Sequence, residues 1–296
     1  MTRELSFTVE PGAGGRADQL VAARFPGAGR RRIAALFSDG AVRVDGKRAR
    51  KGQTVAPGSV IELARAPATT DEELWPVAVD SVAVTLLFAD DDLVAVDKPA
   101  GVPSHPLAAG ERGTVANWLA ARYPDTVGVG NDPREAGLVH RLDIGTSGVL
   151  VATRSRPMWE LLRAAFGRGD VSKLYLAEVD AGARDGACDA PLHQRGHHVA
   201  VDWERGLDAE TRWHVIDRRS GSALVECTAR SGRMHQIRAH LAHVGWPITG
   251  DALYGGRPLP DGGAYRLHAL RLELPHPRTG ARLTIEAPRP PWAATR

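Results

Sequence analysis

Residues 67–82 separate two parts of the chain whose hydrophobic residues follow different patterns. This segment carries prolines, two adjacent threonines and a cluster of acidic residues, and it shows little regular hydrophobic spacing. Such a composition is typical of a linker. We therefore expect a small domain in residues 1–66 and a larger domain in residues 83–296, because a chain of 296 residues is long enough for both.

The first domain is predicted to contain two helices and a basic β-hairpin. Apolar residues recur at helical spacing in GRADQLVAARFPG (residues 15–27) and in RRRIAALFSDG (residues 30–40). AVRVDG (residues 41–46) alternates apolar and polar residues and ends in Asp-Gly, which favours a hairpin turn. A last strand in residues 53–65 completes a small α+β unit.

Positive charge is concentrated in the same domain. The net charge of the whole chain is only +3, which permits a nucleic-acid partner without requiring one. Eight lysines and arginines nevertheless lie within residues 30–51, and they include Arg31, Arg32, Arg43, Lys47 and Arg48. The cluster fits either a solvated basic face or a surface that binds phosphates, and charge alone does not decide between them.

The second domain is rich in predicted strands. Apolar runs indicate strands in residues 83–98 (two runs divided by Asp90-Asp91-Asp92), 147–155, 173–181, 211–219, 222–231 and 281–288. Helical spacing occurs in residues 114–123, 157–169 and 232–245, and Gly169 is expected to cap the second of these helices.

The sequence disfavours several classes of protein. No apolar run approaches the ~18 residues of a membrane helix, so no membrane partner is expected. The N-terminal MTRELSFTVEPGAGG has no apolar signal region, and two isolated cysteines, Cys188 and Cys227, make no disulfide framework. We therefore expect a protein of the reducing cytoplasm.

Neither a cofactor nor a metal is expected. GDALYGG (residues 250–256) lacks the Lys-Ser/Thr ending of a nucleotide-binding loop and is better interpreted as a turn. His193, His197 and His198 lie close together, but no cysteine cluster or carboxylate accompanies them at ligand spacing. An exposed loop or hairpin explains them better than a metal site.

The stretch VHRLDIGTSG (residues 139–148) places Asp143 between a polar approach and the apolar run VLVA. Its two glycines allow tight turns and the close approach of a ligand. The hydroxyls of Thr146 and Ser147 can fix the loop by bonding to its backbone. Asp143 is thus expected on a rigid shelf, although capping of a turn is the more common role of a lone aspartate.

Two other segments supply groups that could act with Asp143. In GRMHQIRAHLAHVG, His235 and Arg238 are three residues apart and share one face of the predicted helix, where Arg238 could hold a carboxylate ionised. In SKLYLAEV, Lys173 and Tyr175 point to the same side of a strand. A tyrosine that faces a cleft offers a ring for base stacking and a phenol for proton transfer. Taken singly, a surface arginine and a half-buried strand tyrosine are the more common explanations.

Together, HRLDIGTSG, KLY and GRMHQIRAHLAHVGWPITGDALYGG resemble the RluA-type pseudouridine synthases, and DDDLVAVDKPAGVPSHP resembles the strand and loop at the start of their catalytic domain. RRRIAALFSDGAVRVDGKRARKG resembles the S-four-type RNA-binding domain that often precedes it. The resemblance implies an α+β protein. Its catalytic domain is expected to have a mixed, mainly antiparallel sheet with a central cleft, preceded by a small α+β RNA-binding domain.

The activity implied by this resemblance is the isomerisation of uridine within an RNA, without cofactor or metal. The resemblance assigns Asp143 as the carboxylate that acts on the ribose, Arg238 as its ion-pair partner and Tyr175 as the residue that stacks on the target uracil. A permanently charged partner suits a carboxylate that must stay ionised in a desolvated pocket. His140 is expected to support the loop.

RNA is the partner that the resemblance implies. Arg141 is expected to enter the space that the flipped uridine leaves, since a planar cation suits that position. The residues predicted to bind RNA are Arg141, Arg233, His235, Arg31, Arg32, Arg43, Lys47 and Arg48. Ribosomal RNA is favoured, transfer RNA remains an alternative, and a monomer is expected.

Two other functions are weighed against this one. A non-catalytic RNA-binding or RNA-remodelling protein could use the same scaffold, but it would have no physical need for Asp143, Tyr175 and Arg238 together. A glycoside hydrolase would need two carboxylates flanking the scissile bond, whereas this motif pairs an aspartate with an arginine and a tyrosine.

Overall fold

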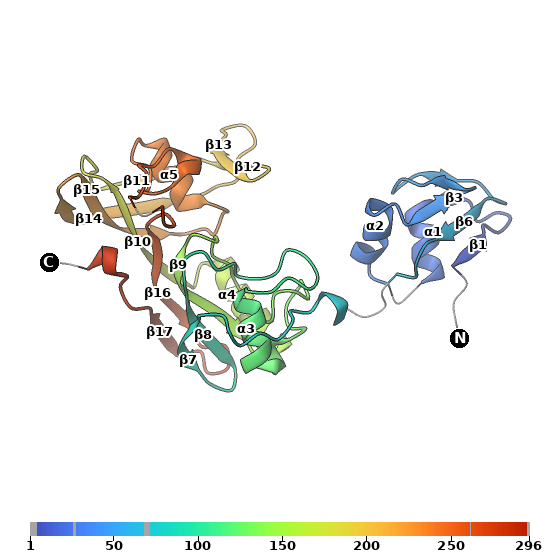
Figure 1. Ribbon diagram of the computed structural model, residues 1–296, viewed down its shortest axis with the longest axis horizontal. Helices are drawn as coiled ribbons and strands as arrows, with labels where there is room; N and C mark the ends of the chain where they lie inside the picture. The colour runs from blue at the N-terminus through green and yellow to red at the C-terminus, as the bar shows by residue number, and fades with distance from the viewer. Residues whose placement is uncertain (1–4, 26–27, 68–71, 261, 295–296) are drawn as a thin grey trace. The chain divides into compact units, whose positions relative to one another are not determined.

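The computed structural model describes residues 5–25, 28–67, 72–260 and 262–294. The chain divides into two compact units, Met1–Glu73 and Leu74–Arg296 (Figure 1). This division falls inside the segment that we interpreted as a linker. The part of the segment after the division packs on the second unit, because the Asn117 side-chain amide donates to the Val77 carbonyl at 2.8 Å and the Val79 N–H donates to the Asn117 carbonyl at 3.1 Å.

The first unit is a small α+β structure. Its elements are β1 (Ser6–Thr8), β2 (Gly15–Arg16), α1 (Ala17–Arg24), α2 (Arg30–Ser38), β3 (Val42–Val44), β4 (Lys47–Arg48), β5 (Thr54–Val55) and β6 (Val60–Leu63). Strands β1, β6, β3 and β4 form one antiparallel sheet in that order, while β2 pairs with β5. Both predicted helices and the basic hairpin are therefore present.

Apolar side chains of both helices and the sheet form the core of this unit. Val21 of α1, Leu36 of α2 and Ile61 of β6 are all almost completely buried in it. The hairpin between β3 and β4 turns at Asp45-Gly46, where both residues have positive φ, 49° and 77°. This is why Asp-Gly suits the position, since glycine and aspartate tolerate left-handed backbone better than most residues do.

The second unit contains the remaining elements. They are η1 (Glu72–Leu74), which spans the division between the units, then β7 (Thr85–Ala89), β8 (Leu93–Lys98), α3 (Val115–Arg122), η2 (Pro124–Thr126), β9 (Ser147–Thr153), α4 (Arg156–Arg168), β10 (Ser172–Asp180), β11 (Gly186–Cys188), β12 (Leu192–Arg195), β13 (His198–Val201), β14 (Thr211–Arg219), β15 (Ser222–Ala229), α5 (Gln236–His243), η3 (Ala252–Tyr254), β16 (Leu267–Pro275), β17 (Arg282–Glu286) and η4 (Pro291–Ala293).

Nine of these strands form one large sheet. Its order is β11-β14-β15-β10-β16-β9-β8-β7, and β17 pairs with the C-terminal half of β16. The pairing of β16 with β9 is parallel, and the other pairs in the sheet are antiparallel. The predicted α+β class with a mixed, mainly antiparallel sheet is confirmed.

Helices cover both faces of the sheet around β8 and β9. Val151 of β9 packs with Trp159 and Leu162 of α4, whereas its neighbour Leu150 packs with Leu119 of α3. Successive side chains of a strand point to opposite faces, so α4 and α3 lie on opposite sides of this strand. Burial on both faces explains why the sequence of β9 is an unbroken apolar run rather than an alternating one.

Helix α5 covers another part of the sheet. Its Ile237 and Leu241 pack with Val225 and Cys227 of β15, so the helix lies against the strands that are drawn in brown in Figure 1. The helix begins at Gln236, later than the sequence predicted. The expectation that His235 lies within the helix was therefore wrong, and the reason is the positive φ of 53° at His235, which α-helical backbone does not allow.

Other expectations have equally clear outcomes. Gly169 ends α4 in a left-handed conformation, as predicted. The segment with three histidines forms the β12–β13 hairpin. In the part of the chain that is described, no helix is long and apolar enough to cross a membrane.

Candidate active site

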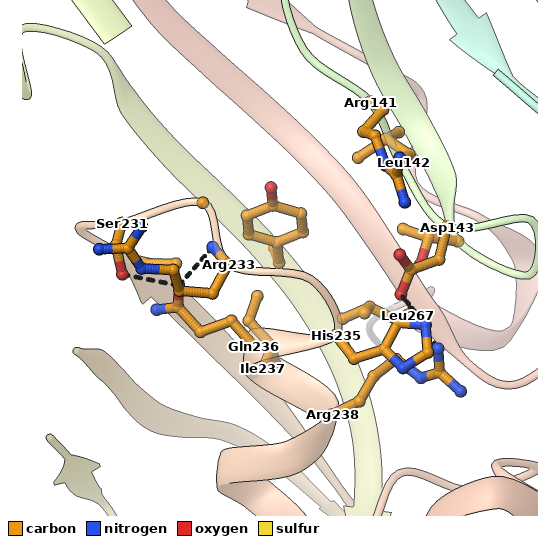
Figure 2. A pocket seen from close by; sticks show the side chains of 14 residues that line it. Arg141, Leu142, Asp143, Ser231, Arg233, His235, Gln236, Ile237, Arg238 and Leu267 are labelled. Carbon is orange, nitrogen blue, oxygen red and sulfur yellow. Dashed lines mark hydrogen bonds and ion pairs between the residues drawn. The ribbon is translucent and has the colours of Figure 1, made fainter. Parts of the chain in front are cut away.

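Asp143 lies in the loop that leads into β9, at the base of a pocket (Figure 2). Its side chain is 22% exposed, so the carboxylate is shielded from bulk water yet open to a ligand. The polar contacts of this carboxylate all reach one oxygen, Oδ2, among the described residues. The other oxygen, Oδ1, is thereby left for a molecule in the pocket.

The loop of Asp143 is fixed by groups from the segment after β8. Lys98 is completely buried, and its ammonium donates to the carbonyls of Pro99, Val102 and Ile144 at 3.0, 2.7 and 3.1 Å. Ser104 accepts from the N–H of Leu142 and donates to its carbonyl. The residues on both sides of Asp143 are therefore tied to one rigid segment. Burial lowers the pKa of Lys98 to about 8, and the nearby Asp143 carboxylate opposes that shift.

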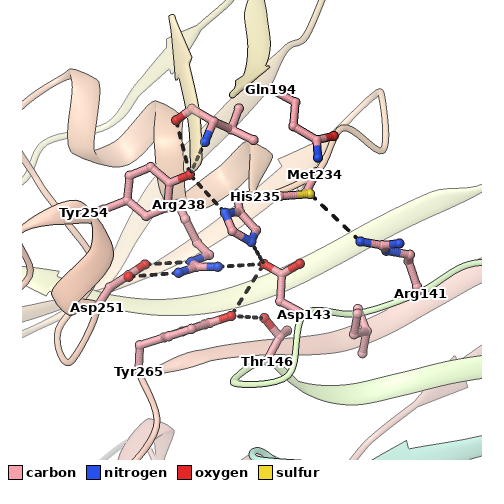
Figure 3. A network of polar contacts seen from close by, with 12 residues as sticks. Arg141, Asp143, Thr146, Gln194, Met234, His235, Arg238, Asp251, Tyr254 and Tyr265 are labelled. Atoms are coloured by element: carbon pink, nitrogen blue, oxygen red, sulfur yellow. Dashed lines mark hydrogen bonds and ion pairs between the residues drawn. The ribbon is translucent and has the colours of Figure 1, made fainter. Parts of the chain in front are cut away.

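Arg238 of α5 joins Asp143 to a second aspartate (Figure 3). Its Nη1 donates to Asp143 Oδ2 at 3.0 Å, while Nε and Nη2 donate to the two oxygens of Asp251 at 2.7 and 3.0 Å. A fork of this kind fixes the plane of the guanidinium. Burial opposes the charge of Arg238, but Asp251 and the neighbouring groups raise its pKa above the usual value. The cation therefore persists beside Asp143.

Two tyrosine rings sandwich the same guanidinium. The ring centres of Tyr265 and Tyr254 lie 4.3 and 5.0 Å from the guanidinium carbon of Arg238. Rings at this distance attract a cation and also exclude water from it. Both aromatic contacts strengthen the hold on Arg238, which has a side-chain exposure of only 6%.

His235 is another polar residue beside Asp143. Its Nδ1 lies 3.0 Å from the Tyr254 hydroxyl, and its Nε2 lies 3.8 Å from Asp143 Oδ2. Burial lowers the pKa of His235, although Asp143 acts in the opposite direction. The φ of His235 is 53°, a left-handed conformation that is uncommon for residues other than glycine and is found repeatedly at active sites.

Tyr175 of β10 lines the same pocket as Asp143 and Arg238. Burial, and then the charge of Asp143, raise the pKa of its phenol. The phenol therefore keeps its proton at neutral pH and can act as a hydrogen-bond donor. The three residues that were singled out as catalytic thus surround one cavity, although they come from three separate elements.

A groove of about 740 Å³ continues from this pocket between α4 and the turn before α5, and the two cavities share Arg141, Tyr175 and Arg233. Six basic side chains line the groove: Arg141, Arg163, Arg168, Lys173, Arg230 and Arg233. Glu135 is the one acidic residue among those that line it, and burial raises its pKa, which favours its uncharged form. The groove therefore has an excess of basic side chains, although Arg168 and Arg230 also pair with Asp170 and Glu210.

Residues predicted to bind RNA lie in two places. Arg141 donates to the sulfur of Met234 at 3.9 Å, and Arg233 donates to the Asp208 carbonyl at 3.0 Å, both beside the pocket. His235 differs, because both of its ring nitrogens face protein groups rather than the open groove.

In the first unit, Arg43, Lys47 and Arg48 are exposed on the β3–β4 hairpin and Arg32 is partly exposed on α2. The side chain of Arg31 lies outside the described part of the chain.

His140 has a supporting role in the loop, as expected. Its Nε2 accepts the N–H of Val151 at 3.1 Å, and its ring stacks on Phe166. Burial lowers the pKa of His140 to about 3, so the ring stays neutral and keeps its acceptor nitrogen.

One cluster of the described residues has the composition of a metal site, but its groups are paired with each other. Asp90, Asp92 and His276 lie close together away from the pocket. His276 contacts Asp90 at 2.9 Å, and Arg278 donates twice to Asp92. These contacts engage the atoms that would bind a cation.

Sequence reasoning missed four residues of the site: Lys98, Asp251, Tyr254 and Tyr265. Asp251 stands in the GDALYGG segment, which we interpreted only as a turn. A carboxylate between the glycines of such a turn was the available signal. Nothing in the local sequence around Tyr265 pointed to Asp143, which is 122 residues away.

Comparisons with known proteins agree with this geometry. A family model described as RNA pseudouridylate synthase matches residues 92–243. Ribosomal large subunit pseudouridine synthase D of Xanthomonas campestris pv. campestris is 35% identical over 94% of this chain and 86% of its own length. The protein of the same name from Pseudomonas aeruginosa is 33% identical over 94% and 89%.

A solved structure, human RNA pseudouridylate synthase domain containing 1, shares the fold. Its TM-score is 0.57 at 21% identity, and the match covers 71% of this chain and 84% of the human chain. The fold, the family model and the extended similarity to bacterial relatives lead to one conclusion. The chain belongs to the RNA pseudouridylate synthase family and is an RNA pseudouridine synthase.

Proposed function

We propose that this enzyme isomerises specific uridines of ribosomal RNA and that Asp143 is its catalytic carboxylate. The choice of RNA is supported by relatives that are named for the large ribosomal subunit. The role of Asp143 rests on one observation above all: its carboxylate contacts Arg238 at 3.0 Å inside the pocket through one oxygen, and no polar contact from the described residues reaches the other oxygen. We further propose that the enzyme acts as a monomer in the cytoplasm.

Asp143 acts on the ribose of the bound uridine, as a nucleophile or as a base. The bond from the ring nitrogen to the ribose breaks, the uracil turns, and a ring carbon bonds to the same ribose carbon. That ring carbon loses its hydrogen as a proton, and the freed nitrogen gains one. Arg238 keeps the carboxylate ionised and oriented, since an opposite charge at hydrogen-bond distance favours the charged form.

Tyr175 stacks on the target uracil and holds its plane while the bond to the ribose is broken. A uridine in a helix or stem-loop reaches the pocket only after flipping, which costs a few kcal/mol of unstacking. Arg141 lies at the pocket entrance and fills the space left in the RNA stack. Its planar guanidinium can stack on bases and still contact phosphate.

The basic groove and the first unit bind the RNA backbone. The groove cations meet phosphates next to the flipped nucleotide, and the exposed Arg43, Lys47 and Arg48 of the β3–β4 hairpin meet phosphates further away. We propose that the first unit is an S-four-type RNA-binding domain. Such contacts position the RNA without reading its sequence.

Mapping of pseudouridine in total cellular RNA tests the function directly. A strain that lacks the gene is rescued with the wild type, with Asp143→Asn or with Asp91→Asn, a matched change in the exposed β7–β8 turn. We expect at least one ribosomal uridine to be modified with the wild type and with Asp91→Asn but not with Asp143→Asn. A transfer-RNA site instead would correct the substrate, and a site modified with Asp143→Asn would refute the catalytic assignment.

Salt dependence of RNA binding tests the role of the first unit. Replacing Arg43, Lys47 and Arg48 by alanine should weaken binding and reduce the slope of log affinity against log salt by about 2, since each phosphate contact contributes about 0.7–0.9. An unchanged slope would show that this hairpin does not bind phosphate.

A further inference from the structure

Tyr265, in the segment just before β16, contacts Asp143, Thr146 and Arg238 (Figure 3). Its hydroxyl lies 3.5 Å from Asp143 Oδ2 and 3.1 Å from the hydroxyl of Thr146 in the same loop. Its ring lies 4.3 Å from the guanidinium carbon of Arg238. One side chain therefore contacts the carboxylate, its loop and its ion-pair partner.

Gly145 leaves the room that the Tyr265 ring needs. A Cβ at Gly145 would lie 2.6 Å from ring carbon Cε1 of Tyr265, closer than atoms in contact can approach. The backbone of Gly145 is not left-handed, so conformational freedom does not explain the glycine. Gly145, two residues after Asp143, is therefore small because the Tyr265 ring packs directly against its backbone.

Either hydroxyl can donate in the contact between Thr146 and Tyr265, whereas in the contact with Asp143 the Tyr265 hydroxyl is the donor because a carboxylate oxygen accepts. Thr146 is buried, so its hydroxyl needs a partner, and Tyr265 is the partner within reach. If Thr146 donates to the Tyr265 oxygen, the single phenolic hydrogen is free to point at Asp143. Burial, and then Asp143 itself, raise the pKa of Tyr265, so the phenol keeps that hydrogen at neutral pH.

We propose that Tyr265 is a positioning residue for the isomerisation: it donates to Asp143 Oδ2, and together with Arg238 it keeps the carboxylate ionised and aims Oδ1 at the ribose. Thr146 orients the phenol, and Gly145 admits its ring. This inference rests on the proposed role of Asp143. Tyr265 thus gives Asp143 an uncharged hydrogen-bond donor beside Arg238 and His235.

Several other groups also act on the Asp143 carboxylate, and the effect of Tyr265 must be separated from theirs. They come from α5, the turn before it, β8, β10 and the 249–256 loop: Arg238, His235, Lys98, Tyr175, Tyr254 and Asp251. A change of Tyr265 to phenylalanine removes only the hydroxyl and keeps the ring against Arg238 and Gly145. It is therefore the cleanest probe.

Single-turnover release of hydrogen from the reacting ring carbon, followed with uracil-tritiated RNA and excess enzyme from pH 5 to 9, measures the effect. We expect Tyr265→Phe to lower the rate about 10-fold at pH 7, a typical loss for one hydrogen bond to a charged group. Its acid limb should move to higher pH, because the loss of a donor to a carboxylate favours the protonated carboxyl. RNA affinity should not change.

Thr146→Val should shift the profile in the same direction by a smaller amount, and Tyr123→Phe, a matched change beside α3, should leave rate and profile unchanged. A slower Tyr265→Phe enzyme with an unmoved acid limb would mean that the hydroxyl acts only through packing, which overturns the proposal. An unchanged rate also overturns it. Activity in Asp143→Asn would instead refute the role of Asp143, whatever Tyr265→Phe does.

Discussion

Two loops meet at the guanidinium of Arg238, and each offers it one aspartate. In the 249–256 loop, Asp251 accepts two hydrogen bonds through both of its oxygens, and its side chain is 1% exposed. In the 139–146 loop, Asp143 accepts one bond from Arg238 through one oxygen and is 22% exposed. The same residue type therefore occupies a closed environment on one side and an open one on the other.

The difference in exposure indicates that Asp251 supports Arg238 and that Asp143 is the carboxylate open to a substrate. The Asp251 side chain is 1% exposed and both of its oxygens accept from Arg238, so it has no surface open to a substrate and its role is to hold Arg238 in place. Asp143 has one oxygen that accepts from Arg238, and among the described residues no polar contact reaches its other oxygen in the pocket. If Asp143 is catalytic and Asp251 only supports Arg238, a change of Asp143 should reduce activity more than stability. A change of Asp251 should also reduce stability strongly.

The largest effect is expected for Asp143→Asn on turnover. Asparagine keeps the size of the side chain but is neither a nucleophile nor a base, so turnover should fall at least about 10⁴-fold. The free energy of unfolding should change by less than about 1 kcal/mol, because the ion pair is partly exposed. Single-turnover assays and urea unfolding of the same preparation measure both quantities. Measurable turnover would contradict the assignment of Asp143.

The opposite loop should respond differently. Asp251→Asn leaves the buried Arg238 without its main counter-charge, which should lower the free energy of unfolding by about 3–5 kcal/mol. Turnover should fall about 100-fold, because the guanidinium is no longer fixed beside Asp143.

A matched change in an exposed ion pair controls for the loss of charge alone. Asp80 pairs with Arg122 at the surface, where their side chains are 59% and 56% exposed. Asp80→Asn should change stability by less than about 1 kcal/mol. Equal stability losses in Asp80→Asn and Asp251→Asn would show that burial of Asp251 has no energetic consequence.

Much of this architecture could be predicted from local patterns. The apolar runs of β8 and β9 and the spacing within α5 carry their own signals, because strands and helices have fixed periods. Asp143 and Arg238 each had a common structural explanation when taken singly. Their assignment depended on the resemblance of several ordered motifs to one enzyme family rather than on the local pattern around either residue.

The rest of the site depends on contacts between distant segments. Tyr265 reaches Asp143 only because the parallel pairing of β16 with β9 brings the start of both strands together. Asp251 meets Arg238 through a turn that reverses the chain after α5. His235 was expected inside the helix, and only its backbone angle shows that the helix begins after it, at Gln236. No periodic pattern records such tertiary geometry.

The support of the Asp143 loop can be probed through Lys98. Lys98→Met removes the donor shared by three carbonyls and should lower the free energy of unfolding by about 2 kcal/mol at pH 7. The size of this loss should depend on pH. Burial lowers the pKa of Lys98 from 10.5 to about 8, so between these values the unfolded chain binds more protons than the folded one.

The stability of the wild type should therefore rise with pH relative to Lys98→Met, by up to about 1.4 kcal/mol per pH unit between pH 8 and 10.5. Below pH 8 the difference between the two proteins should be constant. Urea unfolding at half-unit intervals from pH 6.5 to 10 measures it. If the difference shrinks above pH 8, the charged form of Lys98 stabilises the folded protein. Burial would then not be the dominant effect on its pKa.

The smallest effects compare one hydroxyl from each side of the site. Ser104 exchanges two hydrogen bonds with Leu142 beside Asp143, so Ser104→Ala should destabilise the protein by about 1 kcal/mol. Thr249 lies in the 249–256 loop, and its hydroxyl is buried without a hydrogen-bond partner among the described residues. Thr249→Val removes that unsatisfied group and should leave stability unchanged or raise it by about 1 kcal/mol. The two changes should therefore have opposite signs. A destabilised Thr249→Val would show that the hydroxyl bonds to ordered water, and the 249–256 loop would then be held by solvent as well as by Arg238.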